Sequence, residues 1–111
     1  MNKQTDIYRH FKGGYYEIFG FAMVSNAEER YVFYRQMYEP YHFWIRPEEM
    51  FFGKKQVDGN YIDRFYKIGN SFEQLLYAKP LSEIDVTHSE TGGHYRICSN
   101  DAQDIFLLQQ V

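Results

Sequence analysis

The stretch Tyr15-Tyr16-Glu17-Ile18-Phe19-Gly20-Phe21 decides the fold class of this chain, and its pattern returns in Tyr31-Val32-Phe33-Tyr34-Arg35 and in Tyr41-His42-Phe43-Trp44-Ile45-Arg46. Short runs that alternate in this way and are rich in aromatic residues are typical of β-strands with one buried face. Of the 22 aromatic residues, 19 precede Glu73. A small domain buries only part of so many rings, so we expect the rest to form a recognition surface.

Turn signals divide the first part of the chain into strands. Gly13-Gly14 opens the first strand, and a polar loop over residues 25–29 has hairpin length. Pro47, followed by two glutamates, predicts a short helical turn. The expected strands are residues 15–24, 30–38, 41–46 and 61–68, with a tight turn at 58–60. The sequence therefore predicts a mainly β fold, a small roll or barrel.

A boundary at Gly69-Asn70 separates a second part. Ser71 and Gln74 form a capping-box pattern, which predicts a short helix over residues 71–79. Segments 84–88 and 94–98 flank a five-residue loop and predict an extra β-hairpin. Residues 104–111 suit a helix or a strand equally well. We expect a β roll over residues 1–70 and a helix–hairpin extension over 71–111, packed on the roll or on a second subunit.

Charge and cysteine content limit the classes of function. The net charge of −3 is divided unevenly, because residues 1–70 carry +1 and residues 71–111 carry −4. Neither part has the basic balance of a nucleic-acid binder. A single cysteine excludes an intrachain disulfide framework and suits a reducing compartment. The polar N-terminus and the absence of a long apolar run favour a cytoplasmic protein without a membrane partner.

Several short motifs resemble one bacterial family, the domain of unknown function numbered 1653. They are Tyr8-Arg9-His10-Phe11-Lys12-Gly13, Tyr34-Arg35, Trp44-Ile45-Arg46-Pro47 and Met50-Phe51. The resemblance covers about residues 7–68 and implies an SH3-like roll, but no activity and no catalytic residue. Related sequences often carry His-Ser-Glu-Thr in the first hairpin, whereas this chain has those residues as His88–Thr91, which we interpret as turn chemistry.

One candidate site precedes the glycine pair. Arg9, His10 and Lys12 could bind an anion, because Gly13 and Gly14 allow a close backbone approach to a phosphate or carboxylate. The alternative is that these charges are solvated or paired while the neighbouring rings close one end of the barrel. The glycine pair lacks the fuller pattern of a phosphate-binding loop, so the alternative is favoured.

A second candidate site lies on the predicted third strand. Trp44 and Arg46 share one face of it, and Tyr34 and Arg35 lie on the strand expected beside it. Rings beside guanidinium groups can stack on a base, a ribose or a proline. They can equally make structural cation–π contacts. Arg46 suits a ligand contact or an ion pair with Glu48 or Glu49.

Catalytic and metal-site signals are weak. His88 and His94 are expected nearly opposite each other across the predicted hairpin, with Glu90 and Cys98 nearby, but no established metal-binding motif accompanies them. A lone cysteine on an apolar strand is more often a core residue than a nucleophile. We therefore expect no cofactor and favour a protein that is not an enzyme.

The leading hypothesis is a non-enzymatic binding module with an aromatic and arginine recognition face for a small anion, a peptide or a protein. A single-strand nucleic-acid binder using Arg9, Lys12, Arg35, Lys54 and Lys55 is a less favoured alternative. A small enzyme or metal site that uses His10, or His88, His94 and Cys98, is another. A structural domain that forms a homodimer through its C-terminal part is the last.

Overall fold

The computed structural model describes residues 5–25, 27–71, 80–100 and 105–111. Within these ranges most residues are in strands, with one short helix and one 3-10 turn. The elements are β1 (Thr5–His10), β2 (Tyr15–Val24), β3 (Arg30–Gln36), β4 (Phe43–Pro47), α1 (Glu48–Phe51), β5 (Lys54–Val57), β6 (Asn60–Asp63), β7 (Phe65–Ser71), η2 (Leu81–Glu83), β8 (Asp85–His88), β9 (His94–Asn100) and β10 (Ile105–Gln110). No helix among these elements is long and apolar enough to cross a membrane.

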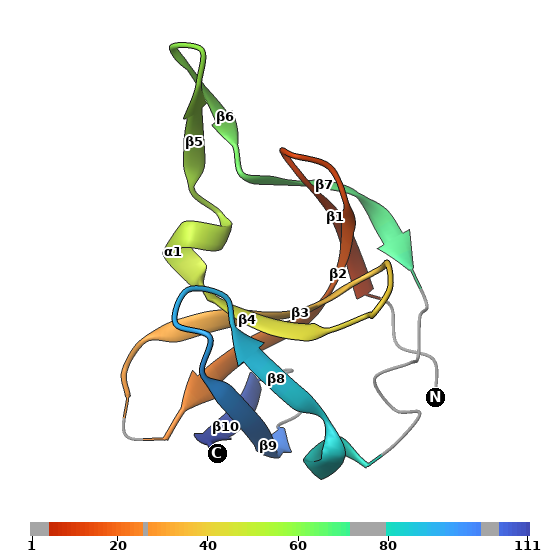
Figure 1. Cartoon of the computed structure of the whole chain (residues 1–111), viewed down its shortest axis with the longest axis vertical. Helices are drawn as coiled ribbons and strands as arrows, with labels where there is room; N and C mark the ends of the chain where they lie inside the picture. Colours follow the sequence, from red (N-terminus) through yellow and green to blue (C-terminus); the bar gives the residue numbers. More distant parts are fainter. Residues whose placement is uncertain (1–4, 26, 72–79, 101–104) are drawn as a thin grey trace.

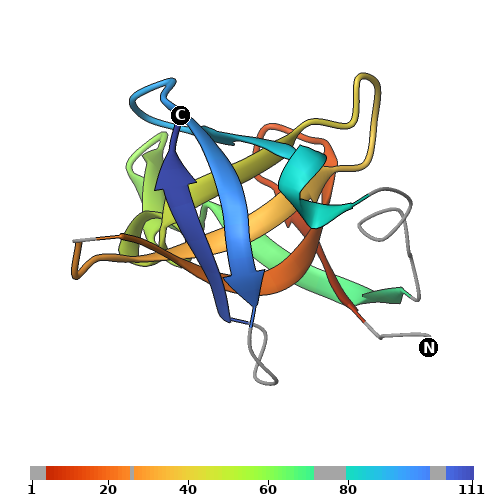
Figure 2. The ribbon, with the colours of Figure 1, turned by 90° about the horizontal axis from the view of Figure 1, so that it is seen from below.

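Six strands close into a barrel, in the order β2-β3-β4-β8-β9-β10 (Figures 1 and 2). Barrel strands that follow one another in the sequence pair in antiparallel fashion. The other two pairs, β4 with β8 and β2 with β10, are parallel. The pair between β10 and β2 closes the barrel, with Phe106 opposite Ala22. Strands from both parts of the chain thus form one hydrogen-bonded sheet.

β2 belongs to two layers because it is long and bent. Its first half pairs with β1 and its second half pairs with β10. The register to β3 shifts between Ile18 and Gly20, where Gly20 has φ 148°. Such a bulge bends a strand and strengthens its twist. β1, which pairs with β2 before the bend, and β7, which pairs with β1, diverge from the barrel and form an outer layer over β3 (Figure 1).

β3 is buried on both faces, so its sequence does not alternate in exposure. Tyr31 and Phe33 face the barrel interior, in a core that includes Ile45, Ile97 and Phe106. Val32 and Tyr34 point the opposite way, into a second cluster. This outer cluster also contains Phe51 of α1 and Phe65 of β7, whose rings are stacked 4.1 Å apart. Most of the aromatic residues before residue 71 therefore lie in two apolar clusters, one on each side of β3.

A short hairpin of β5 and β6 extends away from the rest of the molecule (Figure 1). Asp58 and Gly59 both have positive φ in its turn, at 50° and 82°. This geometry matches a tight two-residue hairpin turn and confirms the turn predicted at 58–60. Lys54 and Asp63 pair across its base at 2.8 Å.

The predicted β fold is confirmed, with differences in detail. The strands expected near 15–24, 30–38 and 41–46, the helical turn after Pro47 and the hairpin over 84–98 are all present. The strand expected over 61–68 is two strands, β6 and β7, and β1 and β5 were not predicted. Residues 105–110 form a strand. The predicted helix over 71–79 falls outside the described residues except for Ser71, which ends β7.

Candidate functional site

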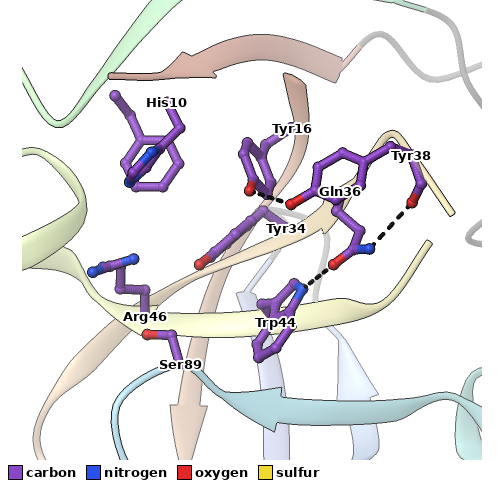
Figure 3. Close-up of a pocket in the computed structure, with 9 residues that line it drawn as sticks. His10, Tyr16, Tyr34, Gln36, Tyr38, Trp44, Arg46 and Ser89 are labelled. Carbon is purple, nitrogen blue, oxygen red and sulfur yellow. Dashed lines mark hydrogen bonds between the residues drawn. The ribbon is translucent and has the colours of Figure 1, made fainter. Parts of the chain in front are cut away.

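A pocket lies between β3 and β4 and the outer layer, on the face of β3 that points away from the barrel interior (Figure 3). Its volume is about 210 Å³. Most of the lining is aromatic, and one arginine joins it. The lining residues are His10, Tyr16, Tyr34, Gln36, Tyr38, Trp44, Arg46, Phe65 and Ser89.

The register between β3 and β4 builds the floor of this pocket. Tyr34 lies directly opposite Trp44, so both side chains project to the same side of the sheet. Tyr34 is only 2% exposed, whereas Trp44 is half-buried. Arg46 is two residues after Trp44 and shares its face, as alternation along a strand requires. The recognition face expected at Tyr34, Trp44 and Arg46 is therefore not a flat surface but a pocket, with the buried Tyr34 at its base.

The polar groups of one half of the pocket bond to one another (Figure 3). The Tyr16 and Tyr38 hydroxyls are 2.6 Å apart. Trp44 Nε1 donates to Gln36 Oε1 at 2.9 Å, and Gln36 Nε2 donates to the Tyr38 carbonyl at 3.1 Å. The Tyr16 ring also meets Tyr34 edge to face, with centroids 5.6 Å apart. These contacts fix the orientation of the rings, and we call this group the aromatic half.

The other half presents hydrogen-bond donors. Arg46 Nη2 forms an ion pair with Glu90 Oε1 at 3.1 Å, and its guanidinium lies 5.7 Å from the Phe65 ring centroid. Arg46 Nε and Ser89 Oγ are buried and make no hydrogen bond of ordinary geometry with the described residues. His10 Nδ1 accepts from the Lys12 backbone N–H at 3.2 Å, so the neutral ring carries its proton on Nε2. We call His10, Arg46 and Ser89 the donor half.

The pKa shifts around the pocket have clear causes. Burial raises the pKa of Tyr34 to about 12, although nearby Arg46 and Ser89 oppose the shift. Burial and the bond to Tyr38 also raise the pKa of Tyr16. Burial, then the positive charges of Arg46, Arg64 and Lys12, lower the pKa of His10 from 6.5. At neutral pH the two phenols are therefore protonated and His10 is uncharged.

The structure brings together four of the residues predicted for a site: His10, Tyr34, Trp44 and Arg46 line the pocket. Arg9 and Lys12 do not line it. Both are exposed; Arg9 donates to the Tyr66 hydroxyl at 2.8 Å, and the Lys12 ammonium lies 5.7 Å from the Phe11 ring centroid.

Arg35 points to the opposite face of β3 from Tyr34 and is 2% exposed. Its Nη2 bonds Glu17 Oε1 at 3.1 Å, and Glu17 also accepts from Thr5 Oγ1 at 2.6 Å. This buried pair contributes nothing to the pocket. The ion pair expected between Arg46 and Glu48 or Glu49 is also different, because Arg46 pairs with Glu90 and Glu48 pairs with Arg30 at 2.6 Å.

Five lining residues were not predicted. Tyr16 and Tyr38 belong to aromatic-rich segments, but nothing local distinguishes them from the other rings. Gln36 is two residues after Tyr34 on β3, so alternation places it on the same face. Phe65 and Ser89 reach the pocket only through the pairing of β7 with β1 and of β8 with β4. Sequence patterns do not specify such long-range pairings.

The histidines of the tail hairpin lie apart. His94 is opposite Thr87, is exposed and forms a 3.0 Å pair with Asp85. His88 is buried, and its Nδ1 accepts backbone N–H groups of Glu90 and Thr91 at 3.0 and 3.2 Å. The turn chemistry expected of His88–Thr91 is thus present. No group of three or more potential metal ligands occurs in the described parts of the chain.

The position of Cys98 differs from the prediction. The apolar pattern predicts a small core residue at Cys98, but the side chain is exposed on β9, because Ile97 before it occupies the inward position. Its Sγ lies 3.8 Å from Gln109 Oε1 on the neighbouring strand. Because neighbouring residues of a strand face opposite sides, a shift of one residue decides whether Cys98 lies in the core or on the surface.

Comparison with known proteins gives one family. No curated protein and no solved structure matches the chain. A family model matches residues 6–67, which is more than half of the sequence and includes every lining residue except Ser89. The chain therefore belongs to the family described as protein of unknown function, DUF1653.

Proposed function

We propose that this protein is a binding module whose pocket accepts a single planar ring. The observation that supports this proposal is the convergence of His10, Tyr34, Trp44 and Arg46, from three separate strands, on one cavity. Aromatic walls fixed by their own hydrogen bonds are preorganised, so a ligand ring gains stacking contacts without ordering them first.

The size of the cavity limits the ligand. An apolar cavity of about 150 Å³ holds one benzene molecule. At about 210 Å³ this pocket has room for one six-membered ring and a small substituent. If the ligand were a whole nucleotide or a peptide, only one of its rings would fit inside the pocket and the rest would stay outside.

Binding is favoured over catalysis by the direction of the pKa shifts. A general acid or base works best when its pKa lies near the operating pH. The pKa values of Tyr16 and Tyr34 are raised, farther from neutrality. These hydroxyls therefore suit fixed hydrogen-bond donors better than proton carriers.

The nucleic-acid alternative receives less support. A single-strand binder needs cations along a continuous path beside the stacking rings. Among the cations named for it, Arg35 is buried on the other side of β3. Lys54 is paired with Asp63 on the projecting hairpin.

Fluorescence tests the proposal directly, because Trp44 is the chain's single tryptophan. Titration with one-ring aromatic compounds should change its emission in a saturable way. Ser89→Phe places a ring in the cavity and should abolish binding, whereas Ser99→Phe, at an exposed position of β9, should leave it intact. If no one-ring compound of any charge binds the wild-type protein, the proposed function is wrong.

A further inference from the structure

The two halves of the pocket differ in how completely their polar groups are used. In the aromatic half, the hydroxyls of Tyr16 and Tyr38 and the polar atoms of Gln36 and Trp44 bond to one another. In the donor half, Arg46 Nε and Ser89 Oγ are buried and make no hydrogen bond of ordinary geometry with described residues, although both groups lie near the Tyr34 hydroxyl. A buried polar group without a well-formed hydrogen bond destabilises the protein, so the donor half is suited to a ligand that accepts hydrogen bonds.

The charges around the donor half point in the same direction. Arg46, Arg64 and Lys12 all lie close enough to His10 to lower its pKa. The lining residues include no carboxylate. Glu90 is the acidic neighbour, and it contacts Arg46 from the rim with a side chain that is 39% exposed. An anion inside the pocket would meet positive potential, and Glu90 would compete with it for Arg46.

The same charges argue against a cationic ligand. Aromatic cages bind quaternary ammonium groups through the ring faces. Here a guanidinium forms part of the wall, and it stands beside the Phe65 ring. A second cation in a pocket of this size would be repelled at short range.

We propose that the pocket binds a planar ring that carries a negative group, a carboxylate or a phosphate. The ring stacks in the aromatic half, and the anion accepts hydrogen bonds from Arg46, Ser89 and His10. This inference rests on the proposed binding function and specifies its ligand. A charge-assisted bond to a guanidinium is about twice as strong as a neutral one, which makes Arg46 the residue that selects the charge.

Four one-ring probes separate the possibilities: benzoate, phenyl phosphate, neutral benzamide and the cation phenyltrimethylammonium. Titrations of the full chain, followed by Trp44 fluorescence and calorimetry, should show at least about tenfold tighter binding of an anionic probe than of benzamide. The ratio of benzoate to phenyl phosphate identifies which anion the site prefers.

Variants locate the effect. Arg46→Gln should reduce the anionic probes to the affinity of benzamide and leave benzamide unchanged. Arg9→Gln removes an exposed arginine outside the pocket and should change neither. Glu90→Gln removes the competing carboxylate and should strengthen anion binding several-fold, a test that does not depend on the folding of the Arg46 variant.

The outcomes distinguish the two proposals. Equal affinity for benzoate and benzamide, or preference for the cation, overturns the anion inference while the ring-binding function stands. An anion preference that survives Arg46→Gln, or that Glu90→Gln does not raise, also overturns it. Failure of all four probes refutes the binding function itself.

Discussion

Replacing Phe106 by alanine should destabilise the pocket side of the molecule, although Phe106 lies in the barrel interior and does not line the pocket. Its ring is fully buried in the barrel, 4.8 Å from that of Phe33. It belongs to β10, which closes the barrel against β2. Truncating a buried phenylalanine to alanine costs about 3–5 kcal/mol, from lost burial and the cavity left behind. That is a large share of the about 5–15 kcal/mol that stabilises a typical domain.

The neighbouring residue provides a matched control. Leu107 lies on the same strand with its side chain 41% exposed. Leu107→Ala keeps the backbone pairing of β10 and removes a partly solvated side chain, so we expect a cost of about 1 kcal/mol or less. The difference between the two variants then measures the inward face of β10.

Urea denaturation followed by Trp44 fluorescence is the suitable assay. Trp44 is on β4, on the pocket side, so it reports on the pocket rather than on β10. With an m-value near 2 kcal/mol per molar, a loss of about 4 kcal/mol lowers the midpoint by about 2 M. If the Trp44 transition of Phe106→Ala coincides with those of Leu107→Ala and the wild type, the C-terminal strands unfold separately. The first 70 residues would then be an independent unit.

Three further perturbations test the arrangement of buried polar groups. Gln36→Leu removes the acceptor of Trp44 Nε1 and should cost about 1–3 kcal/mol while shifting Trp44 emission; an unchanged spectrum would contradict that bond. Glu17→Ala removes the carboxylate that Arg35 contacts and should cost about 3–5 kcal/mol by calorimetry, because both side chains are buried; a cost near zero would refute a structural role. The lowered pKa of His10 means that the unfolded chain binds the proton first. Stability should therefore fall as pH drops below 6.5, and His10→Gln should flatten that slope; an unchanged slope would show that His10 is not its source.

Local pattern predicted most of the strands, because short runs rich in aromatic and β-branched residues lie between turn signals, even in β3, which is buried on both faces. β1 escaped prediction, since Asp6 and Arg9 make Thr5–His10 resemble a polar terminus. The closure of the barrel is beyond local pattern altogether. It depends on two parallel pairings, β4 with β8 and β2 with β10, between segments about 40 and 80 residues apart.

The site was predicted in part for a similar reason. Trp44 and Arg46 are two residues apart on one strand, so alternation alone places them on one face. Tyr34 and Arg35 are adjacent, so the same rule sends them to opposite faces, and only one can reach the pocket. Which one does so depends on what covers each side of β3. That depends on the outer layer, and Phe65 belongs to it by long-range pairing.

The double burial of β3 connects the fold to the candidate function. The inward face holds the barrel together through strands that follow residue 80, and the outward face carries the floor of the pocket. Closure of the barrel also brings the β8–β9 loop beside β4, where Ser89 lines the pocket and Glu90 meets Arg46. The aromatic half lies entirely within the residues matched by the family model, whereas Ser89 and Glu90 lie beyond them. If the pocket binds as proposed, substitutions in this loop should alter the charge preference set by Arg46 while the aromatic walls stay as they are.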